Sequence, residues 1–473
     1  MSTENISSQH TQLEPEPEQT PPPQAQKRAA GHVDLLNGSY ISTLVKFSIP
    51  LTLSFLINMA YSLIDRWFIS RLGTDAIAAI GLGDQMNFLV FTLGSGFSMG
   101  TGIIVARRIG EGNREKANYT ATQAIIFMLV TTVLLTVVLQ LMLPFVLAKF
   151  GASPNVSALA QAYLSAILFG FSGNLLSFQI NAIVRSTGNP VYPTIILVLT
   201  TVINAILAPI FIFVFNMGMY GAGLATASAQ LIGCAINIYS IINGKAGIQL
   251  QLKGFRFDRA IIWSVLLLGI PSSIQMFSVS ITRIAIFKMV AQFGENIMAA
   301  YTLGMNVDFI VFMFVFAVGV AVEIATGQNI GAKKFERVFG YHKAGIKILL
   351  GVIAVLGTLI FFFGSHFTAM YSNNPIVIEE TQKYFHVSVF AYLAFAVGIV
   401  SARVISGAGS AYFSLAIVAG SILLLQLPLI YILCNVVHWN QVGIWIGSAG
   451  GYGLFSIIAL VSVYSKKWMQ AKV

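Results

Sequence analysis

Long apolar runs, separated by short polar stretches, are the dominant pattern of this 473-residue chain. A helix needs roughly 20 mostly apolar residues to cross the hydrocarbon core of a bilayer. Twelve stretches reach that length, six in each half, near residues 44–70, 77–106, 120–147, 159–184, 193–217, 221–243, 261–290, 298–330, 343–369, 383–405, 413–436 and 442–466. The pattern predicts an all-α integral membrane protein with twelve transmembrane helices.

The two halves repeat one pattern at a fixed offset of 221 along the numbering. The register holds without a gap from Pro50 to Gly188 and pairs mainly glycines, prolines and aromatic residues, among them Pro50 with Pro271, Gly73 with Gly294, Gly110 with Gly331, Tyr163 with Tyr384 and Gly188 with Gly409. Each copy has an even number of spans, so both begin on the same face of the membrane. We expect two six-helix lobes related by a pseudo-two-fold axis along the membrane normal.

Proline opens each repeat, at Pro50 and Pro271. Inside a helix it removes a backbone hydrogen bond and allows a kink. A kink kept in both lobes suggests a hinge, although a fixed bend has the same sequence signature.

Composition and charge agree with a membrane protein, since 56% of the residues are hydrophobic and only 9% charged. Soluble proteins average about 25% charged residues. Lys and Arg gather in three loops on one side and at the C-terminus: Arg107, Arg108, Arg114 and Lys116; Lys245, Lys253, Arg256 and Arg259; Lys333, Lys334, Arg337 and Lys343; and Lys466, Lys467 and Lys472. Cytoplasmic loops hold such an excess. Both termini are therefore predicted to be cytoplasmic, in a multi-pass protein of the cell inner membrane. The net charge of +10 then reflects topology and argues against a nucleic-acid partner.

The domain organisation follows from these spans. The first residues are rich in Gln, Glu, Pro and Ser and contain no apolar run that could act as a signal peptide. We expect a disordered cytoplasmic tail at 1–40, an N-terminal lobe at 41–243, a cytoplasmic linker at 244–260, a C-terminal lobe at 261–466 and a short tail at 467–473. Cys234 and Cys434 fall inside spans, so neither a disulfide framework nor a metal-ligand spacing is available.

Catalytic motifs are not found. The chain has no Gly-x-x-x-x-Gly-Lys-[Ser/Thr] phosphate loop, no His-Glu-x-x-His helix and no Gly-x-Ser-x-Gly elbow. An enzyme is therefore disfavoured, and no cofactor is expected beyond a coupling ion. An ion-driven transporter should instead place ionisable residues within its spans, despite a cost of roughly 2.5–3.5 kcal/mol each at mid-membrane.

Asp65 is the best placed of the carboxylates inside spans. It continues a polar stripe of Ser54, Asn58 and Tyr61, because the spacing i, i+4, i+7 and i+11 keeps all four on one helix face. The alternative is that Asp65 is an interfacial residue in a local ion pair with its neighbour Arg66.

Three further spans of the first half carry similar stripes: Asn174, Ser177 and Asn181; Thr200 and Asn204; and Thr226, Gln230 and Asn237. They could converge on one hydrated pocket. Each amide or hydroxyl alone is also explained as interhelical glue, typically worth ~0.6 kcal/mol. As substrate-cleft candidates we select Asn58, Tyr61, Asn174, Gln230, Gln275 and Asp308.

The repeat offers an internal control. At the offset of 221, Asp65 becomes Ile286, Asn181 becomes Ala402, Asn204 becomes Leu425 and Thr226 becomes Gly447. Polar residues needed only for packing should recur in the second lobe, so this comparison favours a functional pocket in the first.

The remaining acids are interpreted by the reverse comparison. Asp308 stands opposite Asn87, and Glu323 stands opposite Gly102. Asp308 is either a second protonatable site or the partner of an Arg such as Arg283, whereas Glu323 is expected to be structural. The role of Asp84 stays open.

At this level of detail the chain resembles the prokaryotic multidrug and toxic compound extrusion (MATE) transporters. The resemblance covers about residues 40–465 and rests on Ile49-Pro50, on Tyr61-Ser-Leu-Ile-Asp65, on the segment from Asn181 to Pro190 and on Gly327-Gln-Asn-Ile-Gly-Ala332. It implies export of bulky, often cationic drugs in exchange for H⁺ or Na⁺ by rocking of the two lobes. It also implies a monomer in contact with membrane lipids.

The family's coupling residues carry over to specific positions. The resemblance implies that Asp65 is the coupling carboxylate, assisted by Asn181, Asn204 and Thr226. Many relatives have an acid where this chain has Ala208. Hard cations prefer charged oxygen ligands, so losing that acid favours H⁺ over Na⁺. The acid that another branch carries on its seventh helix is also missing, near Val279 and Ser280.

Flippases of lipid-linked oligosaccharides, which share the two-lobe architecture, are the alternative. Their anionic headgroups call for several Arg or Lys in the cleft. The candidates here are few, chiefly Arg283, with Arg185 and Arg403 nearer the loops.

Overall fold

The computed structural model describes residues 31–149 and 153–470, and this part of the chain is helical with connecting loops and no strand. The helices of the N-terminal lobe are α1 (Tyr40–Ser70), α2 (Thr74–Gly110), α3 (Arg114–Lys149), α4 (Pro154–Ser186), α5 (Val191–Pro209), the π-helix η1 (Ile210–Val214) and α6 (Gly218–Ile242). Those of the C-terminal lobe are α7 (Arg259–Ala291), α8 (Glu295–Gly331), α9 (Phe335–Ala369), α10 (Pro375–Gly407), α11 (Ala411–Ala419), the π-helix η2 (Gly420–Gln426), α12 (Leu427–Tyr431), the π-helix η3 (Ile432–Val436) and α13 (Asn440–Tyr464), followed by the 3₁₀ turn η4 (Lys467–Gln470).

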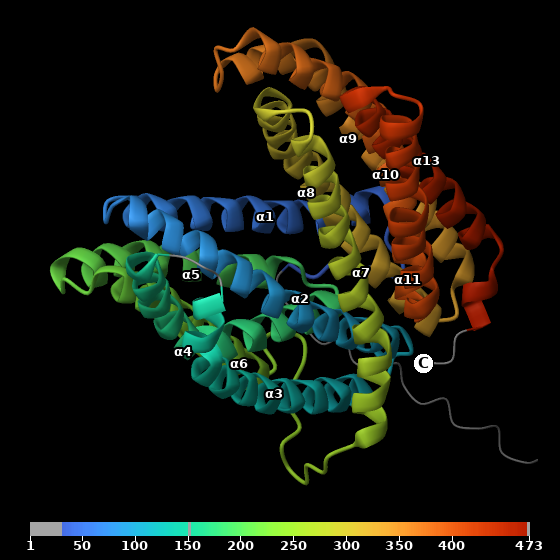
Figure 1. Cartoon of the computed structure of the whole chain (residues 1–473). Coiled ribbons are helices and arrows are strands. Elements are labelled where there is room, and N and C mark those ends of the chain that lie inside the picture. The colour runs from blue at the N-terminus through green and yellow to red at the C-terminus, as the bar shows by residue number, and fades with distance from the viewer. Residues whose placement is uncertain (1–30, 150–152, 471–473) are drawn as a thin grey trace, which may run out of the picture.

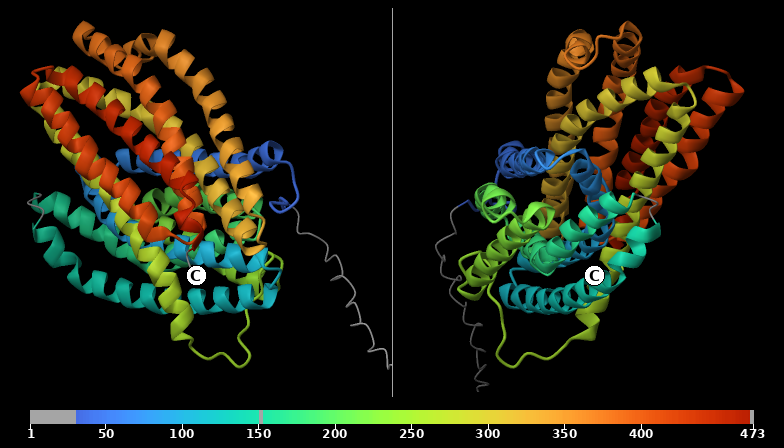
Figure 2. Two further views of the ribbon diagram at one scale, coloured as in Figure 1. Left: turned by 90° about the vertical axis from the view of Figure 1, so that its right-hand side faces the viewer. Right: turned by 60° about the vertical axis from the view of Figure 1, so that its left-hand side comes forward.

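These elements form twelve long rods, because η1 continues α5 and the segments from α11 to η3 make one rod. Eleven of the rods are long and apolar enough to cross a membrane, and α2 is of comparable length. The prediction of an all-α membrane protein in two lobes is confirmed. Figures 1 and 2 show the lobes meeting at one end and diverging toward the other.

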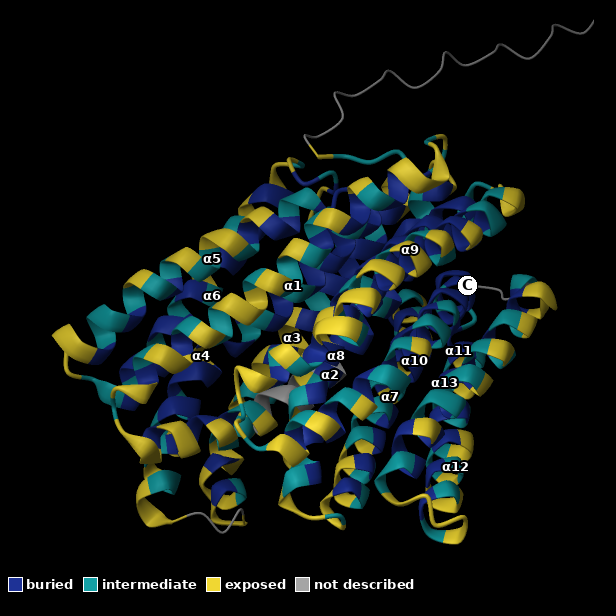
Figure 3. Cartoon of the chain, turned by 90° about the horizontal axis from the view of Figure 1, so that it is seen from above, coloured by how far each residue is buried: buried dark blue, intermediate teal, exposed yellow. Residues whose placement is uncertain are grey.

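Burial separates central from peripheral helices, and the repeat mates α4 and α10, and α3 and α9, agree in this respect. In the most apolar window of α4, α8 and α10, 67% of the residues are buried, against 17% for α3 and α9. Exposed side chains gather on the outer faces of the bundle, for example along α9 (Figure 3). Many of the exposed residues on α3 and α9 are large and apolar, as contact with lipid requires.

Helix boundaries reproduce the repeat closely at first. Between α2 and α8, and between α4 and α10, both boundaries keep the offset of 221. Left-handed glycines follow the same offset, with φ of 99° at Gly188 and 93° at Gly409.

Beyond Gly409 the offset becomes 222. The helices α6 and α13 are both 25 residues long and start at Gly218 and Asn440. The backbone agrees, since φ is 54° at Asn216 and 57° at His438. The second lobe has an additional π-helical segment, η2, in the intervening rod. A π turn holds more residues than an α turn, so η2 accommodates the extra residue without breaking the rod.

The lobes meet where α2 and α8 end, at the end of the molecule that also carries the linker between α6 and α7. We call this the basic end because the Lys- and Arg-rich loops lie there. A Cβ on Gly110 would overlap the carbonyl of Gln328, and a Cβ on Gly331 would overlap the carbonyl of Arg107. Arg107 and Gln328 are themselves repeat mates at the offset of 221, so the repeat axis passes through this contact. Glycine on both sides lets the two backbones touch.

Part of the predicted tail and the predicted linker both pack against the lobes. Residues 1–30 of the expected tail lie outside the described residues. Residues 31–39, for which the same disordered tail is predicted, instead pack between the lobes, and Leu35 is only 1% exposed. The linker rests against α3, where Gln123 donates to the carbonyl of Arg256 at 2.6 Å.

Pro50 and Pro271 lie inside unbroken helices, α1 and α7. Near Pro50, the hydroxyls of Ser54 and Thr194 lie 2.8 Å apart, and each is 2.9 Å from the Pro50 carbonyl. The hinge role stays a prediction.

Candidate functional site

Asp65 lies buried within the N-terminal lobe, with 7% of the residue exposed. The Tyr163 hydroxyl of α4 donates to its Oδ2 at 3.4 Å. Its Oδ1 is buried and has no hydrogen-bond partner among the described residues. A carboxylate can accept several hydrogen bonds, so this one keeps free capacity for a proton or cation.

Arg66 does not pair with Asp65. Its Nη2 lies 2.7 Å from Oδ2 of Asp84 on α2, and both side chains are exposed. The alternative of a local ion pair at Asp65 is therefore not what the structure shows, and Asp84 is the partner of Arg66.

Asn204 and Thr226 meet beside α1. The Asn204 amide of α5 donates to Oγ1 of Thr226 on α6 at 3.1 Å, and both residues are buried. The Tyr61 hydroxyl, one turn before Asp65, is buried close to Thr226 and Asp65. It makes no hydrogen bond of normal geometry to any of the described residues. Four helices thus contribute to one group of side chains, which we call the N-lobe cluster: Tyr61, Asp65, Tyr163, Asn204 and Thr226.

Asn181 is not brought to this cluster. It lies on α4, which runs without a break and already meets Asp65 at Tyr163. The 18 residues from Tyr163 to Asn181 correspond to roughly 27 Å along the helix at 1.5 Å per residue. Asn174, three turns from Tyr163, is roughly 16 Å away by the same measure. Asn174 and Asn181 therefore lie on the same helix as Tyr163 but too far along it to join the N-lobe cluster.

The other cleft candidates take varied positions. Asn58 is exposed and donates to the Ser54 carbonyl at 2.9 Å. Gln230 lies one turn after Thr226 on α6, and its Oε1 is buried without a partner among the described residues. Gln275 is half-buried on α7.

Tyr163 is the member of the N-lobe cluster that sequence reasoning missed. The sequence presents it only as a scaffold position shared by both repeats. The available signal is its chemistry, because a buried tyrosine hydroxyl requires a partner. A tyrosine at the same position of both repeats therefore points to a buried acceptor in each lobe.

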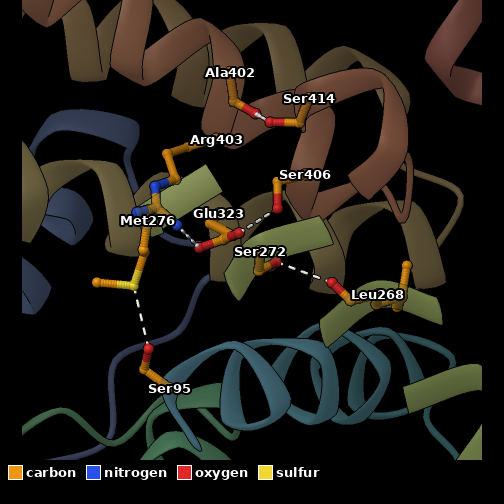
Figure 4. A network of polar contacts seen from close by, with 9 residues as sticks. All are labelled: Ser95, Leu268, Ser272, Met276, Glu323, Ala402, Arg403, Ser406 and Ser414. Atoms are coloured by element: carbon orange, nitrogen blue, oxygen red, sulfur yellow. Dashed lines mark hydrogen bonds and ion pairs between the residues drawn. The ribbon is translucent and has the colours of Figure 1, made fainter. Parts of the chain in front are cut away.

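Glu323 links two helices of the C-terminal lobe. Its carboxylate accepts from Arg403 Nη1 at 3.0 Å and from the Ser406 hydroxyl at 2.6 Å, which joins α8 to α10 (Figure 4). Nearby, the Ser95 hydroxyl of α2 contacts the sulfur of Met276 on α7 at 3.2 Å.

Asp308 has no ion pair among the described residues, with Arg283 or otherwise. Both of its carboxylate oxygens instead accept hydroxyls from α10: Tyr384 donates to Oδ2 at 2.6 Å and Tyr392 to Oδ1 at 2.5 Å. Asp308 is 8% exposed.

The counterparts that the offset of 221 assigns to Asn204 and Thr226, which lie beyond Gly188, are wrong. With the offset of 222 that α6 and α13 display, Asn204 corresponds to Gln426 and Thr226 to Ser448. These counterparts also meet, since the Gln426 amide donates to the Ser448 carbonyl at 3.2 Å. Polarity at these positions is therefore shared by the lobes. Asp65 and Ile286 lie in the part of the repeat where the offset is 221, so this pair is still matched correctly and the acid at this position is present in the first lobe alone.

Comparison with known proteins gives consistent matches over most of the chain. The MatE family model matches twice, at residues 50–210 and 271–432, which places the two matches at the two repeats. A probable multidrug resistance protein YoeA from Bacillus subtilis is 24% identical over 435 residues, covering 90% of this chain and 94% of the relative. A probable multidrug resistance protein NorM from Thermotoga maritima is 25% identical over 440 residues, covering 90% and 92%. A solved structure described as the outward-facing conformation of a multidrug resistance MATE family transporter superposes with a TM-score of 0.86 at 24% identity, covering 93% of this chain and 98% of that one.

Proposed function

The chain belongs to the MatE family, and from that premise we propose that it is a secondary active multidrug antiporter that exports organic, often cationic, compounds in exchange for protons. Proteins of this family are transporters, not enzymes. The observation that carries the proposal is Asp65, a buried carboxylate in a span of the N-terminal lobe, one oxygen of which has no partner in the described part of the chain. Such residues are costly in a membrane and mark ion or substrate pathways.

The composition of the N-lobe cluster favours a proton over Na⁺. Asp65 is its only carboxylate, and the other members supply neutral amide and hydroxyl groups. Ala208, one turn after Asn204, is fully buried and adds no side-chain oxygen ligand. Hard cations prefer several charged or carbonyl oxygens, whereas a proton needs a single free carboxylate oxygen.

The transport cycle then couples protonation of Asp65 to the alternate opening of the two ends of the molecule. With the basic end closed, Asp65 Oδ1 takes up a proton from the opposite side. The N-lobe cluster loses its negative charge, and a bound organic cation loses its counter-charge and leaves. Closing the diverging end and opening the basic end releases the proton inside and restores affinity for the next cation.

The orientation is proposed from the positive-inside rule. The basic end faces the cytoplasm of the cell inner membrane, with both termini on that side. The transporter works as a monomer surrounded by lipid, with small organic molecules as its partners.

The test is efflux of ethidium from proteoliposomes under an imposed pH gradient or an imposed Na⁺ gradient. We expect the pH gradient to drive efflux, and Asp65→Asn to lower its rate at least tenfold, because an amide cannot release a proton. Glu379→Gln is the matched control, because this acid on α10 is exposed.

Unchanged pH-driven efflux in Asp65→Asn would contradict the assignment of the coupling residue. Efflux driven only by the Na⁺ gradient would show that the coupling ion is Na⁺ and not a proton. Absence of dye transport, together with transfer of a lipid-linked anion, would favour a flippase.

A further inference from the structure

The C-terminal lobe contains a group of buried polar residues that corresponds to the N-lobe cluster. The tyrosine that reaches the carboxylate is the same repeat position in both lobes, Tyr163 and Tyr384. A buried amide follows at matched positions, Asn204 and Gln426. What differs is the helix that supplies the acid: α1 carries Asp65, whereas α8 carries Asp308.

Polar and aromatic side chains of α7, α8, α10 and α13 lie around Asp308. Tyr384 and Tyr392 reach it from α10. Arg283 on α7, Tyr301 on α8 itself and Tyr452 on α13 lie within electrostatic range, with Arg283 too far for an ion pair. Tyr452 also interacts with Gln426. The acid is thus stabilised by hydroxyl dipoles and a distant cation, and lacks the directly paired counter-charge found at Glu323.

Protonation of this carboxylate would change its packing. An ionised carboxylate accepts two tyrosine hydroxyls, but a protonated one has an O–H that must donate. The protonated oxygen is a poorer acceptor than a carboxylate oxygen, so the hydrogen bond from the tyrosine hydroxyl on that oxygen weakens. A proton at Asp308 therefore alters how α8 is held to α10, the two central helices of the lobe.

We propose that Asp308 is a second proton-binding carboxylate of the transport cycle, so that each lobe carries one proton site. The proposal rests on proton-coupled export and deepens it: a univalent organic cation would exchange for two protons instead of one. Two protons against one positive charge move net charge across the membrane. Export then responds to membrane potential as well as to the pH gradient.

Charge balance gives a test that a purely structural role of Asp308 would not affect. Efflux of ethidium, a univalent cation, is measured in proteoliposomes at a fixed pH gradient, with and without a potassium diffusion potential set by valinomycin. Wild-type efflux should change severalfold with the potential. Asp308→Asn should still pump under the pH gradient and lose the dependence on potential, because one proton for one cation is electroneutral.

Tyr392→Phe provides a second variant that keeps the acid. It removes one of the two donors and should shift the pH dependence of efflux without changing the charge moved. Infrared difference spectra of the purified full chain supply an independent measurement: a carboxyl band that titrates with pH should disappear in Asp308→Asn and remain in Asp65→Asn. If Asp308→Asn does not fold well enough to pump, the infrared spectrum of Tyr392→Phe tests the proposal instead. Loss of the Tyr392 hydroxyl should shift the carboxyl band only if that band belongs to a titrating Asp308.

The outcomes separate the two proposals. Wild-type efflux that ignores the pH gradient overturns the proposed function. Wild-type efflux driven by the pH gradient, with the same dependence on potential in Asp308→Asn, overturns the second proton site alone. An infrared pattern unaffected by Asp308→Asn does the same.

Discussion

The buried ion pair between Glu323 and Arg403 connects the central helices α8 and α10. The Arg403 and Glu323 side chains are 12% and 7% exposed. Removing one member of a buried pair leaves the other charge uncompensated, at a cost of roughly 3–5 kcal/mol. Arg403→Ala should lower the unfolding temperature of the detergent-purified protein clearly, since Ser406 alone would remain on the carboxylate.

Two further variants check the cause of that loss. The double variant Glu323→Gln with Arg403→Ala should recover part of it, because no buried charge is then left unpaired. Arg66→Ala breaks the exposed pair with Asp84 and should change the unfolding temperature little. An Arg403→Ala protein that melts like the wild type would show that the buried pair is not needed for stability.

At single residues, sequence reasoning identifies the buried acid but not its partners. Helical spacing places Asp65 on a polar face, and Asp65 itself is buried, whereas Asn58 on the same face is exposed. Spacing within one helix cannot show how far along its axis a neighbouring helix crosses. That is why the polar stripes group Asn181 with Asp65, although α4 meets this acid at Tyr163.

At the scale of elements, the spans and their order are predictable because membrane helices need long apolar runs. Element boundaries from the repeat are equally reliable through α4 and α10. The shift by one position at η2 is not predictable, since a π-helical turn has no strong sequence signature. It changes the counterpart of Asn204 from Leu425 to Gln426.

Contact between the ends of α2 and α8 depends on glycine at both repeat positions. We expect Gly110→Ala and Gly331→Ala each to prevent close approach at the basic end, because the added Cβ would meet backbone and not a movable side chain. Efflux should fall severalfold while the helices remain intact, since alanine favours helix by roughly 0.5–1 kcal/mol over glycine.

Spin labels on Glu115→Cys and Glu336→Cys measure this directly. The two positions are exposed repeat mates in the first turns of α3 and α9. The distance between the labels should lengthen in Gly110→Ala and stay unchanged in Gly351→Ala, where no atom lies within 4 Å of the added group. An unchanged distance in Gly110→Ala would remove the glycine contact from the closing mechanism.

At the scale of the whole molecule, residues 31–39 bind both lobes at the basic end, and we call them the strap. The Val33 amide donates to the Gly188 carbonyl of the N-terminal lobe at 2.8 Å. The Leu35 carbonyl accepts from two residues of the C-terminal lobe, Asn329 at 3.0 Å and Tyr341 at 2.8 Å. In the proposed cycle, opening the basic end would separate these attachments, and the strap would then release from one lobe.

Weakening one attachment should therefore favour the open basic end. Replacing Asn329 by Ala and Tyr341 by Phe removes two hydrogen bonds of about 1 kcal/mol each, which corresponds to a population shift of roughly 10–30-fold. Hydrogen exchange at the amides of the strap should accelerate by a similar factor. Lys334→Ala, which removes only exposed contacts to the strap, is the control and should leave exchange nearly unchanged. If the double variant exchanges at the wild-type rate, the strap follows the lobes without holding them, and closure of the basic end rests on the glycine contact between α2 and α8.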